Sequence, residues 1–375
     1  MIYLDHAATT PPDPDVLDRM TVTAREAWGN PSSPHAAGRR ARAAIDASRR
    51  MMADMIGVEP QEIVFVASGS EGNTLALRGV CDRWMEERGT PGHLILLAIE
   101  HHCSLKPLAR LRKEGWRVTL LPVDPDGILR IADLAGALTD DTALVSVQWA
   151  NSEIGVVQPV PDIARICRDA SVPFHCDAVQ GVGQIAFPRD LPDLLTIAAH
   201  KFYGPKGVGA LIVRAGVRLA PQVLGGGQEG GLRAGTENTP GIVGMARALE
   251  IALARLESDA KRLTRLRDTF IANIETIPGA SLNGHRGKRL PNNAHFRFAG
   301  RKGETVVIRL DQNGICASAG SACSAGSAEP SHVLEALGRT PAEADENVRF
   351  TLGRGTTEED LKKTAAVLRG ILATR

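Results

Sequence analysis

Short apolar runs alternate with longer stretches of helical periodicity over the first half of the chain. The apolar runs lie at residues 62–66, 94–99, 118–121, 143–147, 173–177 and 194–198. Helix-like stretches lie between them at residues 73–86, 105–113, 131–138 and 161–168. Strands that alternate with helices are typical of βαβ units, and strands buried on both faces are nearly continuous in apolar residues. The pattern therefore predicts an α/β fold with a mostly parallel sheet flanked by helices.

The pattern changes after the apolar run at residues 207–213. A helical stretch extends from about residue 242 to residue 274, and its second half is rich in charged residues. Beyond it the sequence predicts strands at 295–298 and 348–352 and helices at 304–313 and 358–372. Because a helix of this length commonly bridges two domains, we expect a large domain of residues 16–255 and a smaller α/β domain. The small domain would comprise residues 1–15 and 256–375.

Composition and charge narrow the class of protein. The chain has 375 residues, 43% hydrophobic and 23% charged, so it can bury a large core. A formal net charge of +1 argues against a nucleic-acid or membrane surface that covers the whole molecule. The most apolar run, at 94–99, is far shorter than the roughly 20 residues that span a bilayer. No signal-peptide pattern precedes it, and we expect a cytoplasmic protein that binds neither nucleic acid nor membrane.

The six cysteines form no CxxC pair, so neither a disulfide framework nor a metal site is expected. Cys323 lies in a segment, residues 317–328, in which every other residue is Ala, Ser or Gly. Nothing in this segment can anchor to a core, so we expect a mobile loop that presents Cys323 as an exposed nucleophile. Cys316 lies in a strand-like stretch and is expected in the core.

Three candidate residues stand at or just after the ends of predicted strands, where ligands bind in open α/β sheets. Lys201 could form a Schiff base with a carbonyl, although a solvated surface lysine is the more frequent case. Asp177 could pair with a cationic ligand nitrogen or cap the next helix. His101 could stack on a planar ligand and carry protons, or be an ordinary loop histidine.

Two further features suit the binding of anionic groups. Small residues at 66–73, including Gly69 and Ser70, separate a strand from a helix and could hold an anion on backbone N–H groups. A plain serine N-cap explains the same pattern. Arg349 is flanked by apolar residues in a predicted strand, where a planar guanidinium suits a carboxylate; a structural ion pair is the alternative.

Taken together, the segments resemble the cysteine desulfurases of the NifS/IscS type. These are pyridoxal 5′-phosphate-dependent enzymes of fold type I, in class V of the aminotransferase superfamily. The resemblance rests on ten motifs spread nearly end to end, at residues 3–11, 29–33, 153–155, 175–180, 200–207, 225–229, 233–238, 320–323, 329–331 and 349–354. One such motif is weak evidence, and this many in the same order is strong evidence.

The resemblance implies which residues hold pyridoxal 5′-phosphate: Lys201, Asp177, Gln180, His101, His200, Gly69, Ser70, Asn151, Ser152 and Thr236. Lys201 would form the Schiff base, Asp177 would pair with the pyridinium nitrogen, and Gln180 would bind the phenolic oxygen. His101 would stack on the ring and shuttle protons. Thr236 would reach the phosphate of a partner subunit, which implies a homodimer. Ser152 and Ala198 stand where relatives commonly have asparagine and serine, so two cofactor contacts differ from the family pattern.

The resemblance also implies a reaction. L-cysteine would be converted to L-alanine, with Arg349 on the substrate carboxylate, Asn30 near the site, and Cys323 taking the sulfur as a persulfide. A sulfur-acceptor protein would carry it on for iron–sulfur clusters or other thio-cofactors. A selenocysteine lyase, a pyridoxal-phosphate aminotransferase and a non-catalytic sulfur-carrier or docking protein are the alternatives. The chain ends soon after its last predicted helix, so we expect it to lack the scaffold-docking extension of IscS-type relatives.

Overall fold

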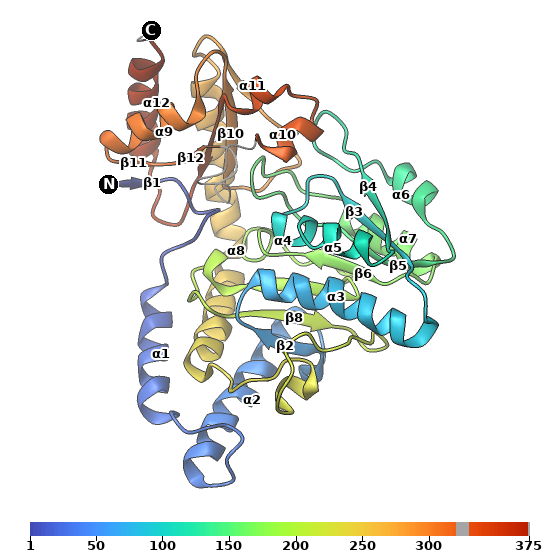
Figure 1. Ribbon diagram of the computed structural model, residues 1–375. Helices are drawn as coiled ribbons and strands as arrows, with labels where there is room; N and C mark the ends of the chain where they lie inside the picture. The colour runs from blue at the N-terminus through green and yellow to red at the C-terminus, as the bar shows by residue number, and fades with distance from the viewer. Residues whose placement is uncertain (320–329, 374–375) are drawn as a thin grey trace.

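A seven-stranded sheet dominates the computed structural model, which describes residues 1–319 and 330–373 (Figure 1). Its strand order is β2-β8-β7-β6-β5-β3-β4. All neighbours are parallel except β8, which runs antiparallel to both β2 and β7. The strands are β2 Ile63–Val66, β3 His93–Leu97, β4 Arg117–Leu121, β5 Thr142–Ser146, β6 Phe174–Asp177, β7 Leu194–Ala198 and β8 Gly209–Val213. The mostly parallel sheet that the apolar runs predict is confirmed.

Helices cover both faces of this sheet. In β2, Ile63 and Phe65 join a core with α2, α7 and the start of α8, whereas Val64 and Val66 join another with α3 and α5. This alternation follows from the two-residue period of a strand. The helices are α1 Pro14–Glu26, α2 Ala36–Ile56, α3 Gly69–Arg88, α4 His102–Leu105, α5 Leu108–Lys113, α6 Ile131–Ala137, α7 Val160–Asp169 and α8 Thr239–Ile274, with short 3₁₀ turns η1 Pro60–Glu62, η2 Ala199–Lys201 and η3 Gln228–Gly231. The apolar pattern did not single out α1, because it buries only Val16 and Thr23.

The long helix α8 is confirmed and joins two hydrophobic cores. It begins after Asn238, whose side-chain oxygen accepts the N–H of Gly241 at 3.1 Å and caps the first turn. Residues up to Ala252 pack beneath the large sheet, whereas Leu263 to Ile274 pack into a second core. The boundary at 255/256 stays a prediction, and it falls in the stretch of α8 between the two cores.

The second core lies under a four-stranded antiparallel sheet of order β12-β13-β10-β9, with a two-stranded sheet of β1 and β11 beside it. Phe270, Phe296 and Phe350 meet at its centre with ring centroids 5.4–6.2 Å apart. The elements are β1 Ile2–Tyr3, β9 Ala280–Leu282, β10 Asn293–Phe298, β11 Ile315–Cys316, β12 Ser318–Ala319, β13 Asn347–Thr351, α9 Gly303–Gln312, α10 His332–Ala336, α11 Pro341–Ala344 and α12 Glu358–Ala373.

Two details depart from the expected division of the chain. Val333 and Leu334 of α10 pack with the core of the large sheet, although they lie within the predicted small domain. Cys316, expected in the core, is only partly buried, because β11 pairs with the short terminal strand β1 alone. In the part of the chain that the structure describes, no helix has the length and apolar character needed to cross a membrane.

Candidate active site

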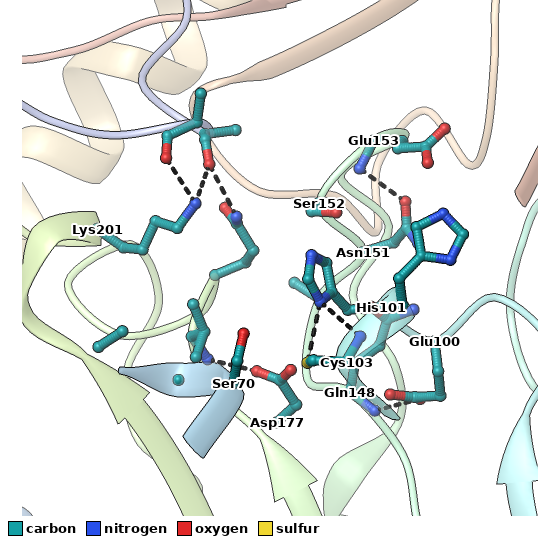
Figure 2. Close-up of a pocket in the computed structure, with 18 of the residues that line it drawn as sticks. Ser70, Glu100, His101, Cys103, Gln148, Asn151, Ser152, Glu153, Asp177 and Lys201 are labelled. Atoms are coloured by element: carbon teal, nitrogen blue, oxygen red, sulfur yellow. Dashed lines mark hydrogen bonds between the residues drawn. The ribbon is translucent and has the colours of Figure 1, made fainter. Parts of the chain in front are cut away.

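The carboxyl ends of β3, β6 and β7 open onto a cavity of about 370 Å³, within the size range of small-molecule pockets (Figure 2). Two walls face it. The large-sheet wall consists of Glu100, His101, Asp177, His200 and Lys201, and the small-sheet wall consists of Arg349 with Asp5 and Ser318 behind it. The candidate residues that line the cavity are Gly69, Ser70, His101, Asn151, Ser152, Asp177, Gln180, His200, Lys201 and Arg349.

Three candidates are not among the lining residues. Thr236 borders a smaller pocket of about 130 Å³ next to Glu229 and Asn238. Asn30 lies in the connection between α1 and α2, where its side-chain oxygen accepts the N–H of Ser32 at 2.9 Å. Cys323 falls outside the described residues. The roles implied for these three residues stay predictions.

Lys201 ends the short turn η2 that follows β7. Its Nζ donates hydrogen bonds to the carbonyl oxygens of Ala7 and Ala8, to the latter at 2.8 Å (Figure 2). The amide of Gln180 donates to the same Ala7 oxygen at 3.0 Å. The N-terminal segment therefore brings the ends of Lys201 and Gln180 together, although the three segments are far apart in the sequence.

Tyr203 fixes the exit from the Lys201 turn. It adopts φ +68°, a conformation that costs a non-glycine residue energy and needs support from its surroundings. Its N–H donates to Thr10 Oγ1 at 2.7 Å, and its hydroxyl accepts the N–H of Arg354 at 2.8 Å. The Arg354 guanidinium also lies 4.0 Å from the Tyr203 ring centroid. Contacts from two distant parts of the chain thus hold the backbone that carries Lys201.

Asp177 ends β6 and is 7% exposed. One carboxylate oxygen accepts the N–H of Val179 at 3.0 Å, and the other accepts the side-chain amide of Asn73 at 2.6 Å. Both donors are neutral, and a buried carboxylate is best stabilised by a cation. Behind it, burial lowers the pKa of His175 to about 4, so that side chain is neutral near pH 7. Asp177 therefore suits a protonated ring nitrogen of a ligand.

His101 caps the N-terminus of α4, and its ring lies beside Cys103. Its Nδ1 accepts the N–H of Cys103 at 3.2 Å and lies 2.9 Å from the Cys103 sulfur (Figure 2). The sequence analysis predicted a role for His101 but none for Cys103. The spacing in the sequence could have indicated Cys103, because a residue that caps a helix lies close enough to contact the residue two positions later.

Glu100 is the principal residue of the large-sheet wall that the sequence analysis missed. One carboxyl oxygen accepts the N–H of Gln148 at 2.7 Å, and the other is buried without a partner among the described residues. Burial raises the pKa of this carboxyl well above its usual range, and the nearby Asp177 adds to the shift. Burial therefore favours the protonated, uncharged form of the Glu100 carboxyl. The sequence could have indicated Glu100, because this acidic residue directly follows the apolar run at residues 94–99.

The N-terminus of α3 supplies a place for an anion. Ser68 caps the helix, because its hydroxyl accepts the N–H of Glu71 at 3.2 Å, and Gly69 and Ser70 form the first turn. A Cβ on Gly69 would come within 2.8 Å of the Val179 side chain, so only glycine fits against that residue. Burial, with Lys201 and Lys206 nearby, lowers the pKa of His200 to about 4. A neutral His200 can donate a hydrogen bond to a phosphate without carrying charge.

Asn151 and Ser152 lie between the two walls. The Asn151 amide donates to the Ile99 carbonyl at 3.0 Å, and its oxygen accepts the N–H groups of Glu153 and Ile154, each at 2.9 Å. The amide thus shapes the loop, and a cofactor contact from it stays a prediction. The carbonyl of Ser152 accepts a hydrogen bond from Arg349 at 2.8 Å.

Arg349 lies on β13 and is 3% exposed. One terminal nitrogen donates to Asp5 at 2.8 Å and another donates to the Ser152 carbonyl at the same distance. Its Nε is buried and has no acceptor among the described residues. The ion pair, which the sequence left open as an alternative, is present, and the guanidinium lies on a residue that lines the cavity.

The residues present fit pyridoxal 5′-phosphate. The Gly69 turn offers backbone N–H groups to a phosphate, Asp177 offers a carboxylate to the ring nitrogen, and Lys201 offers an amine to the aldehyde. Each of these groups reaches the cavity from a different strand end. The fit rests on this set of donors and acceptors around one cavity.

Comparisons with known proteins agree with this fit. The family model for the class-V aminotransferases matches residues 2–364. The cysteine desulfurase IscS of Dictyoglomus turgidum is 46% identical over 374 residues, which cover 99% of this chain and 94% of the relative. The cysteine desulfurase IscS 1 of Archaeoglobus fulgidus is 43% identical, with coverage of 99% and 97%.

A solved structure of a NifS-like protein superposes with a TM-score of 0.93, at 36% identity and with full coverage of both chains. The fold type that the resemblance implies is therefore confirmed. The chain belongs to the class-V aminotransferase family, and within it to the cysteine desulfurases of the NifS/IscS type, which depend on pyridoxal 5′-phosphate.

Proposed function

We propose that this enzyme converts L-cysteine to L-alanine, transfers the sulfur to Cys323 as a persulfide, and delivers it to an acceptor protein. The sulfur would serve iron–sulfur clusters or other thio-cofactors in the cytoplasm. The observation that carries the proposal is the pairing of Lys201 and Asp177 with a buried, unused Arg349 donor around one cavity. This arrangement suits an amino acid held by its carboxylate beside a pyridoxal site.

The cofactor, when bound, acts as an electron sink for the carbon skeleton of the substrate. Arg349 orients the substrate by its α-carboxylate through Nε and the terminal nitrogens, which a planar fork can do and an ammonium cannot. Lys201 Nζ takes and returns the proton at the substrate Cα. Asp177 keeps the ring nitrogen protonated, because its own two partners are neutral donors.

Sulfur transfer needs a thiolate nucleophile. The Cys323 Sγ forms a bond to the substrate sulfur while the substrate Cβ–S bond breaks, and that electron pair stays with the carbon skeleton. His101 supplies a proton to the departing fragment, which leaves as alanine. The overall exchange balances: cysteine and the Cys323 thiol give alanine and the Cys323 persulfide.

We also propose a homodimer. Thr236 and Asn30 do not line the cavity of their own chain, and a second copy could bring them to its site. Trp28 and Leu224, which are 74% and 81% exposed, lie near Asn30 and Thr236 in sequence and suit such an interface. Light scattering of the purified protein tests this, and a monomer with full activity would contradict it.

The activity is tested by mixing the enzyme with L-cysteine and a reductant and measuring alanine and sulfide. Cys323→Ser should keep the absorption band of the bound cofactor and lose sulfide release. Cys316→Ser, which changes a partly buried cysteine on β11, is the control and should stay active. Lys201→Ala should lose the cofactor band. Full sulfide release by Cys323→Ser would refute the persulfide step, and faster alanine formation from L-selenocysteine would favour the lyase.

A further inference from the structure

Cys103 is the thiol in the cavity wall that the mechanism above does not use. Its sulfur lies 2.9 Å from His101 Nδ1, and the Asn73 side-chain nitrogen lies 3.1 Å from that sulfur. The same Asn73 nitrogen lies 2.6 Å from Asp177 Oδ2. Four side chains from α3, α4, the strand end of β6 and the His101 cap are thus joined in one series of contacts.

The direction of each hydrogen bond follows from the groups involved. A backbone N–H only donates, so the Cys103 N–H requires a lone pair on His101 Nδ1. A neutral imidazole with that lone pair carries its hydrogen on Nε2. The thiol hydrogen is then also directed to Nδ1. At the other end, a carboxylate only accepts, so the Asn73 amide nitrogen faces Asp177 and its second hydrogen can reach the sulfur.

We propose that Cys103 and Asn73 are positioning residues that hold His101 as its Nε2–H tautomer and connect it to Asp177. Asn73 donates to both Asp177 and the Cys103 sulfur, and Cys103 donates to His101. The roles of His101 and Asp177 in this proposal rest on the proposed function.

The charged groups around His101 agree with this assignment. Glu100 lies directly before it, and burial raises the pKa of that carboxyl well above its usual range, which favours its uncharged form. The ring of His102 lies 6.4 Å from the His101 ring, centroid to centroid. Asn73 with Cys103 forms a hydrogen-bonded route from the Asp177 carboxylate to His101.

The test compares Cys103→Ala with Cys103→Ser in the complete holoenzyme. Cys103→Ala should lower kcat by about three- to tenfold, the effect of one hydrogen bond, and shift the pH profile of kcat, while KM for L-cysteine stays unchanged. Cys103→Ser keeps a donor and an acceptor and should restore both. Cys167→Ala, which removes a buried thiol on α7, is the control and should match the wild type.

A second readout does not depend on turnover. Nitrogen-15 NMR of histidine-labelled holoenzyme, with the His101 signals assigned from a His101→Gln variant, should show an unprotonated Nδ1 and a protonated Nε2. Cys103→Ala should move the Nδ1 signal and Cys103→Ser should restore it. An unchanged signal and pH profile in Cys103→Ala, or equal impairment of both variants, would overturn the proposal. If the enzyme released no sulfide yet the NMR signals behaved as expected, the proposed function alone would fail.

Discussion

The two walls of the cavity treat their buried charges in opposite ways. On the large-sheet wall, the hydrogen-bond donors to Asp177 and Glu100 among the described residues are neutral, and burial raises the pKa of Glu100. On the small-sheet wall, Arg349 is paired with Asp5, which also accepts the Ser318 hydroxyl at 3.0 Å. One wall therefore leaves a carboxylate for a cationic ring, whereas the other pairs its buried cation with a carboxylate of the same chain.

The largest expected effect comes from removing the charge on the large-sheet wall. Asp177→Asn keeps the side-chain shape and loses the partner of the ring nitrogen, so kcat should fall by at least about 100-fold. Asp193→Asn is the matched control, because Asp193 accepts the Phe174 N–H at 2.9 Å at the opposite end of the same strand. Steady-state assays of alanine formation decide it. Equal losses in the two variants would show that charge at the carboxyl end of β6 is unimportant.

The small-sheet wall should respond in substrate binding. Arg349→Ala removes the proposed carboxylate anchor and leaves Asp5 without its cationic partner, so kcat/KM for L-cysteine should fall by about 100-fold. Arg349→Lys should recover only part, because an ammonium lacks the planar fork. Arg297→Lys serves as the control: Arg297 lies in the same small sheet and pairs with Glu343 and Glu346. Retention of wild-type KM in Arg349→Ala would remove Arg349 from the substrate site.

Asp5 tests whether the resting ion pair competes with substrate. Asp5→Asn keeps an acceptor for Arg349 and Ser318 and removes a negative charge from beside the substrate carboxylate. KM for L-cysteine should therefore fall by about threefold at low salt, and the difference should shrink as salt screens the charge. A higher KM in Asp5→Asn would mean that Asp5 orients the guanidinium instead of competing for it.

Much of the large-sheet wall could be predicted from the sequence, because its side chains follow apolar runs. The carboxyl ends of parallel strands meet at one edge of a sheet. The positions of Lys201, Asp177 and His101 at or just after predicted strands were therefore enough to predict that they lie close together. Asn73 could not. It lies inside α3, where a polar residue usually faces solvent, and its burial depends on how α3 packs over β6.

The small-sheet wall was harder to predict for a related reason. Arg349 and Asp5 are 344 residues apart, and their contact depends on β1, β12 and β13 being assembled around one core. Flanking apolar residues showed that the guanidinium would be buried. They could not show that its partner would come from the first residues of the chain, because no local pattern encodes a contact at that separation.

The smallest effect on activity, and the sharpest test of the large-sheet wall, is expected for Glu100→Gln. A protonated carboxyl and an amide each offer one acceptor and a donor in this position, so kcat should stay within about twofold.

The stability of the folded protein should change with pH instead. The folded-state pKa of Glu100 lies well above the ordinary value of 4.5 because of burial. The unfolded chain therefore releases this proton first, and the unfolding free energy falls as pH rises from about 4.5 to the folded-state pKa, by up to about 1.4 kcal/mol per pH unit. Glutamine carries no such proton, so the Tm of Glu100→Gln should rise relative to wild type as pH increases across that window. Thermal unfolding of the two holoenzymes over a pH series measures this, with Glu304→Gln, a change in the first turn of α9, as the control. A Tm difference that is constant with pH would mean that Glu100 is ionised, and the contrast between the two walls would then be lost.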